Sequence, residues 1–333
     1  MSQVEIIASL FQDELRLKDV SCFDNFFDLG GDSMMAESLI IALNAHFGTI
    51  LPTSTLLEAP TPDSLAKKIA LMSNRKDFAR LVTTLTDCTG KVPAAMVHGM
   101  SGSPLFVSRF GGGFKQRCQI AAVRGMGLVP GENPLTTADE IADAYMTGLQ
   151  TSIGRQPEVF GGICLGGLVA LDLARRQFQS TRKRPIIILI DPPPPGSAWL
   201  KPMQNNEMTK RRTKQLHRQV IRWRRLRDRL DRLGLSGSVL GRKARRETFK
   251  KSLKRALAGH TPKPFPSEIL MIASTDWGRT TVEQYRSWAQ PTSSITIEVI
   301  PGEHGGFQTA NATLIDEIIS GFLDKNLPSQ ATT

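Results

Sequence analysis

The glycine-rich stretch FGGICLGG, residues 160–167, constrains the fold of this chain more than any other feature. An apolar, β-type segment enters it, and a helix-forming run, residues 168–175, leaves it. This is the strand–turn–helix setting of the nucleophile motif G-x-S-x-G, with Cys164 where serine usually stands. Flanking glycines let the strand and the helix cross closely, while the turn strains the nucleophile's backbone. Cys164 is therefore a candidate nucleophile at a helix start that favours a thiolate; a buried, inert cysteine in a packing turn is the alternative.

Length and composition favour two globular domains of unequal size. The chain has 333 residues, 40% of them hydrophobic, with no run of 18 apolar residues and no basic segment before an apolar N-terminal run. We therefore expect neither a membrane span nor a signal peptide. The four cysteines are far apart and form no C-x-x-C pair, which indicates neither a disulfide framework nor a metal site. A cytoplasmic location fits this pattern.

The first 72 residues predict a small acidic bundle of short helices. They contain ten acidic and four basic residues, and their apolar residues recur at helical spacing. Gly30 and Gly31 allow a tight bend, and Ser33 opens the next helix. A phosphodiester on Ser33 would meet free backbone N–H groups and the positive end of the helix dipole. The alternative is that Asp32 and Ser33 only cap this helix.

Residues 24–33, DNFFDLGGDS, resemble the attachment motif of peptidyl and acyl carrier proteins, [DE]-x-F-F-x-x-G-G-[DH]-S. The resemblance covers the whole bundle and implies a carrier domain over residues 1–75. It also implies that Ser33 receives 4′-phosphopantetheine from a phosphopantetheinyl transferase. Because the chain begins with this carrier, we expect adenylating, condensing or other loading enzymes to act in trans.

Strand-like segments then alternate with helical patterns, which predicts a mostly parallel, doubly wound sheet. Apolar runs at residues 93–97, 184–190, 268–274 and 295–300 are among the expected strands. Cys164, Asp191 and His304 each follow the end of an expected strand, in the order nucleophile, acid, histidine. This order predicts a catalytic triad. Asp276 also ends a strand and is the alternative acid.

Residues 79–325 resemble the thioesterase domains of nonribosomal peptide and polyketide synthases. The resemblance rests on the V-H-G-x-x-G start, the glycine-rich turn with its helix, and the P-G-x-H ending. It implies an α/β-hydrolase domain over residues 79–328, and the acid position of the family favours Asp191 over Asp276. The backbone N–H groups of Met100 and Leu165 are the expected oxyanion hole. Cysteine in place of serine departs from the family, and a thioester on Cys164 would keep the acyl group activated.

A basic insertion at about residues 197–264 lies where the resembled family has its lid. Residues 201–264 contain twenty-one basic and four acidic residues. Apolar stripes predict two helices, ending at Gly234 and Gly259; their members are Leu216, Val220, Trp223, Leu230 and Leu233, then Phe249, Leu253 and Leu257. Arginines fill the other faces of the first helix: Arg222, Arg224, Arg225, Arg227 and Arg229. They form either a solvated outer face or a docking surface for an acidic carrier, in cis or in trans. An anionic acceptor or membrane surface is a less favoured alternative, and no nucleic-acid-binding motif is present.

These patterns predict a small all-α carrier bundle followed by an α/β-hydrolase with a helical, basic lid. The expected function is to accept an acyl or peptidyl chain on phosphopantetheine, transfer it to Cys164 and release it by hydrolysis or cyclisation. The expected setting is thiotemplate natural-product biosynthesis. An acyltransferase that passes the group to another carrier or an external amine is one alternative. A non-catalytic carrier or docking module is the other.

Overall fold

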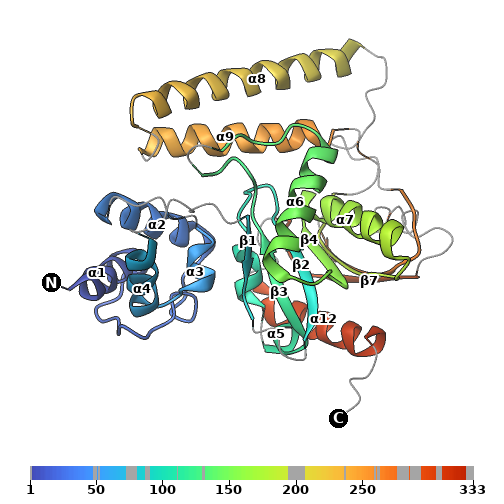
Figure 1. Cartoon of the computed structure of the whole chain (residues 1–333), viewed down its shortest axis with the longest axis horizontal. Coiled ribbons are helices and arrows are strands. Elements are labelled where there is room, and N and C mark those ends of the chain that lie inside the picture. Colours follow the sequence, from blue (N-terminus) through green and yellow to red (C-terminus); the bar gives the residue numbers. More distant parts are fainter. Residues whose placement is uncertain are drawn as a thin grey trace.

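A computed structural model of the chain shows a helical bundle, an α/β domain and a long helical hairpin (Figure 1). The described residues are 2–47, 51, 53–72, 81–86, 91–110, 112–129, 132–193, 207–235, 238–258, 260, 263–275, 285, 294–304 and 310–327. The expected boundary between the two domains, at residues 75–79, lies outside them. No helix among these residues is both long and apolar enough to cross a membrane.

The N-terminal bundle consists of α1 (Gln3–Leu15), α2 (Ser33–Phe47), α3 (Thr55–Glu58) and α4 (Pro62–Met72). Helix α1 begins with a capping box, in which the Ser2 hydroxyl accepts the Glu5 N–H and the Glu5 carboxylate accepts the Ser2 N–H. Phe26 is fully buried and meets the ring of Phe11 edge to face, with centroids 5.2 Å apart. A side chain at Gly31 would collide with the Phe26 ring. Phenylalanine and glycine therefore fix the loop before α2.

The α/β domain is built on a seven-stranded sheet in the order β1-β3-β2-β4-β5-β6-β7. The strands are β1 (Val82–Thr84), β2 (Val92–Val97), β3 (Cys118–Val123), β4 (Val159–Ile163), β5 (Ile186–Ile190), β6 (Glu268–Ser274) and β7 (Ser294–Ile300). Only the edge strand β1 pairs antiparallel, and β2 to β7 run parallel. The predicted doubly wound α/β sheet is confirmed. Its parallel strands bring their carboxyl ends to one edge.

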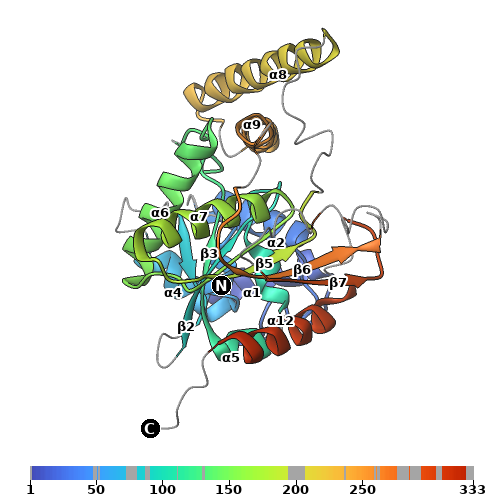
Figure 2. The same cartoon turned by 90° about the vertical axis from the view of Figure 1, so that its right-hand side faces the viewer.

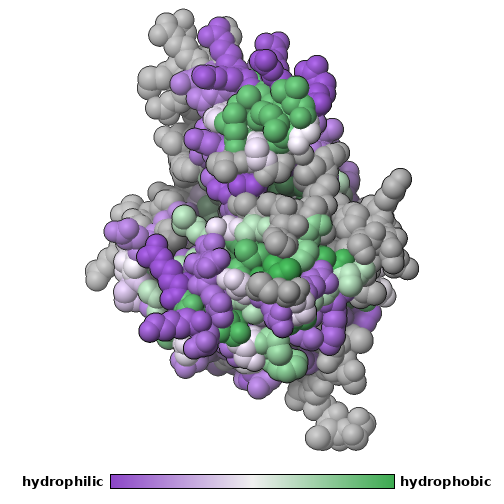
Figure 3. Space-filling model, turned by 90° about the vertical axis from the view of Figure 1, so that its left-hand side faces the viewer, coloured by the Kyte–Doolittle hydropathy of each residue, from purple (hydrophilic) through white to green (hydrophobic). Residues whose placement is uncertain are grey.

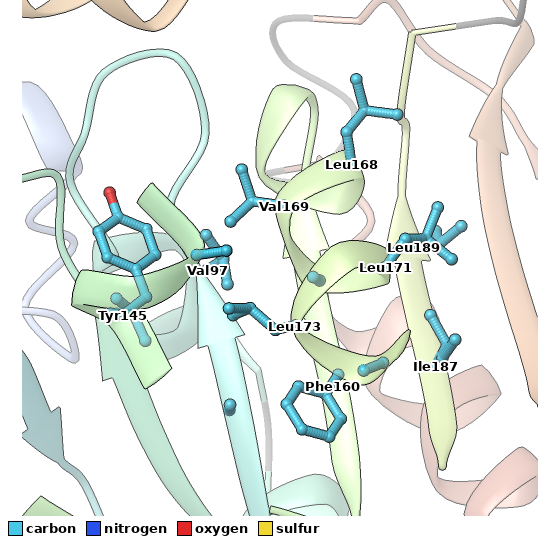
Figure 4. Packing of buried hydrophobic residues seen from close by; sticks show 14 of the residues in the cluster. Val97, Tyr145, Phe160, Leu168, Val169, Leu171, Leu173, Ile187 and Leu189 are labelled. Carbon is cyan, nitrogen blue, oxygen red and sulfur yellow. The ribbon is translucent and has the colours of Figure 1, made fainter. Parts of the chain in front are cut away.

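Helices cover both faces of the sheet, which Figure 2 shows nearly edge-on. One face carries α6 (Ala138–Ile153) and α7 (Leu165–Thr181), and the other carries α5 (Gly112–Arg117) and α12 (Ala312–Asn326). Thr137 caps α6, since its side chain accepts the Glu140 N–H at 3.1 Å. Side chains of α7 interlock with those of β2, β4 and β5 (Figure 4). This packing holds the start of α7 firmly over the sheet.

The basic insertion forms a hairpin of α8 (Glu207–Arg232) and α9 (Val239–Ala256), with α9 next to the sheet domain (Figure 2). Gly234 adopts φ +70° at the end of α8, as expected for a helix-ending glycine. Two expectations are wrong. Leu233 is 61% exposed rather than buried, and Figure 3 shows an apolar patch at this end of the hairpin. Arg227 is buried against α9 and the adjoining loop, where it donates to Asn133 Oδ1 at 2.8 Å.

Gly166→Ala is expected to destabilise the domain strongly. A Cβ at this first-turn position of α7 would collide with the backbone carbonyl of His98, which cannot move without shifting β2. We expect the free energy of unfolding to fall by about 3 kcal/mol or more. Urea denaturation followed by circular dichroism measures the change.

Gly321→Ala is the matched control. It also lies in a helix, α12, but nothing lies within 4 Å of its Cβ position. Alanine there should raise the free energy of unfolding by about 0.5–1 kcal/mol. Equal effects of the two variants would contradict the close strand–helix crossing.

Candidate active site

Cys164 stands on a strained turn between β4 and α7. Its backbone has φ 53° and ψ −128°, a conformation rarely adopted by a residue with a side chain. The Cys164 N–H donates to the carbonyl of Ile190 at 2.9 Å, which ties the turn to the end of β5. Side chains at Gly162 or Gly166 would collide with the backbone across the turn. The glycines therefore allow the crossing, and the crossing holds the Cys164 side chain at the carboxyl edge of the sheet.

Asp191 and His304 meet at the same edge, although 113 positions separate them. Asp191 follows β5 directly, has φ 48° and is fully buried. Its Oδ2 is 2.5 Å from His304 Nδ1 and also accepts the Ser274 hydroxyl at 3.1 Å. Its Oδ1 accepts the Ser274 N–H at 2.8 Å. The carboxylate is thus held rigidly against one nitrogen of the imidazole.

The other nitrogen of His304 is available to Cys164. Hydrogen bonding to Asp191, and then to the Cys164 side chain, raises the pKa of His304 to about 10. The three side chains therefore form one connected line of hydrogen bonds. A positively charged imidazole beside the sulfur stabilises negative charge there. Asp276, the alternative acid, lies outside the described residues.

A second histidine, His98, directly follows β2 and is fixed as a neutral group. Burial lowers its pKa to about 4. Its Nδ1 donates to the Gly99 carbonyl at 2.6 Å, and its Nε2 accepts the Tyr145 hydroxyl at 2.5 Å. His98 therefore has a structural role in shaping the loop after β2.

The two expected oxyanion residues lie next to Cys164, Leu165 along the chain and Met100 in the loop after β2. Leu165 is the first residue of α7, where the backbone N–H groups have no partner within the helix. Met100 follows Gly99, whose Cβ position is 3.8 Å from the Cys164 Cβ. The backbone at both positions thus adjoins Cys164. Their role as oxyanion donors stays a prediction.

Helix α9 of the lid covers the loop that contains Met100. The Phe249 ring fills the space above Gly102 and Gly125, and a side chain at Gly102 would lie 2.6 Å from it. The same ring packs on His98 with centroids 5.4 Å apart. Phe249 and Leu253 also line a very small cavity of about 10 Å³ with Tyr145. The lid is therefore anchored in the wall of the site.

The carrier bundle contacts the α/β domain close to Ser33. Glu37, one helical turn after Ser33, forms an ion pair with Arg246 of α9. Asp28, five residues before Ser33, lies near enough to Lys115 of α5 to raise the pKa of that ammonium, although burial, the larger effect, lowers it overall. Leu105 opens the 3₁₀ helix η1 (Leu105–Arg109) and packs into the carrier core. These contacts place the start of α2 at the interface between the two domains.

The surroundings of Ser33 fit a covalent phosphopantetheine group in part. Ser33 is half-buried at the start of α2, and its neighbour Met34 is 81% exposed. The expectation of free backbone N–H groups is wrong, because Asp32 Oδ1 accepts the N–H groups of Met34 and Met35, each at 2.8 Å. Asp32 therefore caps α2. A phosphodiester on Ser33 would therefore have this carboxylate as a neighbour.

Sequence reasoning missed Ser274, Phe249 and Tyr285. Ser274 ends β6, so a polar residue at the carboxyl end of a strand was a usable signal. Tyr285 is fully buried and donates to the Pro192 carbonyl at 2.5 Å, which braces the segment after Asp191. No local pattern distinguishes this tyrosine. Phe249 was expected only as part of a lid stripe, and its place above the loop depends on how the hairpin packs.

Two family models match the chain. The model described as a thioesterase domain matches residues 93–325, and the model described as a phosphopantetheine attachment site matches residues 5–69. The chain belongs to the thioesterase domain family. It also contains a carrier domain of the type in which a serine holds 4′-phosphopantetheine covalently. The resemblance inferred from the sequence motifs is confirmed.

Two curated relatives of this thioesterase are much longer proteins. Indigoidine synthase from Streptomyces lavendulae is 31% identical over 204 residues, which cover 58% of this chain and 15% of the synthase. Atromentin synthetase invA1 from Paxillus involutus is 31% identical over 177 residues, which cover 51% of this chain and 18% of the synthetase. The chain thus spans less than a fifth of the length of these curated relatives.

Two solved structures are similar in fold to this thioesterase. The four-domain nonribosomal peptide synthetase AB3403 aligns with 98% of this chain at a TM-score of 0.57 and 20% identity, using 26% of its own length. The NocB thioesterase domain aligns with 73% of this chain at a TM-score of 0.52 and 18% identity, using 99% of its length. At these identities the likeness shows the fold alone.

Asp191→Asn is expected to lower the pKa of His304 from about 10 toward its ordinary value of 6.5, since the hydrogen bond to the carboxylate is the main cause of the shift. An amide cannot stabilise the imidazolium by charge, so release of a bound acyl group should slow by about two to four orders of magnitude. NMR titration of the His304 ring measures the pKa.

Asp316→Asn is the control for loss of a buried carboxylate. Asp316 accepts the N–H groups of Gly113 and Phe114 on the opposite face of the sheet. This variant should leave the His304 titration unchanged. A titration that moved equally in both variants would show that Asp191 does not govern His304.

Proposed function

We propose that this chain receives an acyl or peptidyl chain on its carrier, takes it onto Cys164 and releases it by hydrolysis or by closure of a lactone or lactam. The carrying observation is the connected line from Cys164 through His304 to Asp191, at the carboxyl edge of the sheet. Membership of the thioesterase domain family supports acyl-thioester chemistry. The setting we propose is thiotemplate natural-product biosynthesis.

The chemistry follows from what each residue can do. Cys164 attacks the acyl carbonyl and forms a thioester on its own sulfur. His304 takes the proton of the Cys164 thiol and gives it to the carrier thiol that leaves. It later removes a proton from the attacking water, amine or hydroxyl. Asp191 keeps the imidazole oriented and stabilises its positive charge. The backbone N–H groups of Met100 and Leu165 stabilise the developing oxyanion.

Ser33 is the residue we propose as the attachment point of 4′-phosphopantetheine. This group supplies a thiol on a flexible arm, which holds the acyl chain as a thioester. The Glu37–Arg246 ion pair supports this assignment, because it turns the start of α2 toward the lid that covers the loop beside Cys164. Gly31 and Phe26 hold the loop before Ser33 in place.

The proposed partners follow from this chemistry. A phosphopantetheinyl transferase is needed to modify Ser33, and enzymes that activate or condense acyl units are needed to load the carrier. Chemistry of this kind uses cytoplasmic substrates, so we propose a cytoplasmic location. The partners we propose include an acyl or peptidyl substrate but no nucleic acid.

Acyl transfer to another carrier or to an external amine is the second candidate function. The observation that favours it is the sulfur of Cys164 in place of an oxygen. Exchange between two thioesters is close to energetically neutral, because the bond broken and the bond formed are of the same kind. The step is therefore reversible, and the acyl group stays activated for a further acceptor.

Intact-mass spectrometry of the full chain tests the proposal. After treatment with a phosphopantetheinyl transferase and acyl loading, Ser33→Ala should gain no mass, whereas wild type should gain the arm and its acyl group. Peptide mapping should then find the acyl group on Cys164 in wild type and only on the arm in Cys164→Ala. Acyl groups that never leave the arm of wild type would support a non-catalytic carrier instead.

Cys164→Ser separates the two candidate functions. Serine forms an oxygen ester, which is less activated, so we expect transfer to an added amine or carrier to slow by at least about tenfold relative to hydrolysis. Chromatography of the products with and without acceptor gives this ratio. An unchanged ratio and rate would remove any special role for sulfur.

A further inference from the structure

Helix α9 carries a row of four cations at every fourth position: Arg242, Arg246, Lys250 and Lys254. Neighbours at this spacing lie on one side of a helix, and the row rises about 18 Å from first to last. All four side chains are half-buried, and none reaches the exposure of Lys243 or Arg255 on the other sides of the helix. We call these four residues the α9 row.

Two members of the row, Arg246 and Lys254, relate it to the two functional centres. Arg246 pairs with Glu37, one helical turn after Ser33. Lys254 lies close enough to Cys164 for their charges to interact; burial lowers the pKa of the Lys254 ammonium, and the sulfur raises it. Figures 1 and 2 agree that α9 passes above both α2 and the sheet domain. The row therefore extends from the carrier toward the nucleophile.

Because these four side chains are half-buried, their charged groups have lost part of their hydration. It lowers the pKa of Arg242 and of Arg246, as it does that of Lys254. Among the described residues, Glu37 pairs with Arg246, and Glu247 lies 3.6 Å from Lys250. A further anion at the row would offset the cost of dehydration.

An anion that needs such cations is implied by the carrier. Its first 72 residues hold ten acidic and four basic residues, and Asp32 already occupies the N–H groups at the start of α2. A phosphodiester on Ser33 thus lies in an acidic domain beside a carboxylate that already accepts two of the backbone N–H groups at that helix end. Arg246 is a cation of the α/β domain in direct contact with α2.

We propose that the α9 row binds the phosphodiester of the carrier's own arm and leads the arm toward Cys164. Arg246 and Lys250 bind the phosphodiester, and Lys254 is the member of the row whose charge interacts with Cys164. The lid is then an electrostatic guide as well as a cover. The proposal rests on Ser33 as the attachment point.

The test is ³¹P NMR of the full chain carrying the arm. At low salt, the phosphodiester resonance of wild type should be at least about twice as broad as that of Arg246→Gln/Lys250→Gln, because ion pairing restricts motion and salt screens it. High salt should narrow the wild-type line to that of the variant. Acyl transfer from the arm to Cys164 should slow about tenfold in the variant, as expected for loss of positioning.

Two control variants separate phosphate binding from other effects. Lys243→Gln/Arg255→Gln removes two exposed cations from other sides of α9 and should leave the resonance broad. Glu37→Gln breaks the ion pair with α2 but keeps every cation of the row, so the broad line should persist. Circular dichroism verifies that each variant is folded.

The outcomes keep this inference distinct from the proposed function. Equal line widths in the row variant and in Lys243→Gln/Arg255→Gln would overturn phosphate binding while leaving transfer to Cys164 intact. A Glu37→Gln variant as narrow as the row variant would show that the row only docks the carrier, which also overturns it. A chain that gains no arm at Ser33 gives no such resonance and overturns both proposals.

Discussion

The close crossing of β4 and α7 is the contact on which the site depends. At Gly162 and Gly166 the backbones approach so closely that no side chain fits, and the chain between them turns through a left-handed residue at Cys164. The strain is held by the packing of α7 against three strands and by the hydrogen bond from Cys164 to the end of β5. Cys164, the proposed nucleophile, is therefore positioned by the backbone and the core packing around it.

Sheet order then decides which residues can reach this sulfur. Strands β4 and β5 are neighbours, so Asp191 comes close to Cys164 through one strand pairing. His304 arrives from the loop after β7, and Ser274 at the end of β6 holds the carboxylate between them. A parallel sheet places all these strand ends at one edge, which is why residues so distant in sequence share a single site.

Helix α9 of the basic hairpin contacts both domains. Phe249 inserts into the loop that leads to Met100, and Arg246, one turn earlier on the same helix, meets Glu37 of the carrier. Buried arginines secure the hairpin from within: Arg245 donates to Asp231 of α8 at 2.6 Å, and Arg227 to Asn133. A movement of α9 would therefore change the carrier contact and the wall of the site together.

The sequence by itself determined the features that arise between near neighbours in the chain. The glycine turn around Cys164, the attachment loop before Ser33 and the order of strands and helices all follow from local sterics and periodicity. Exposure within the basic hairpin did not follow in this way. Leu233, expected to be buried, is exposed, and Arg227, expected on the outer face, is buried. Strand order and the family resemblance predicted that Asp191 meets His304, and the structure shows that contact. Only the tertiary structure decided that Ser274 holds the carboxylate, that Phe249 covers the loop after β2, and that Arg246 meets Glu37. The reason is physical: each contact joins residues far apart in sequence, so it depends on strand order and hairpin packing rather than on any local pattern.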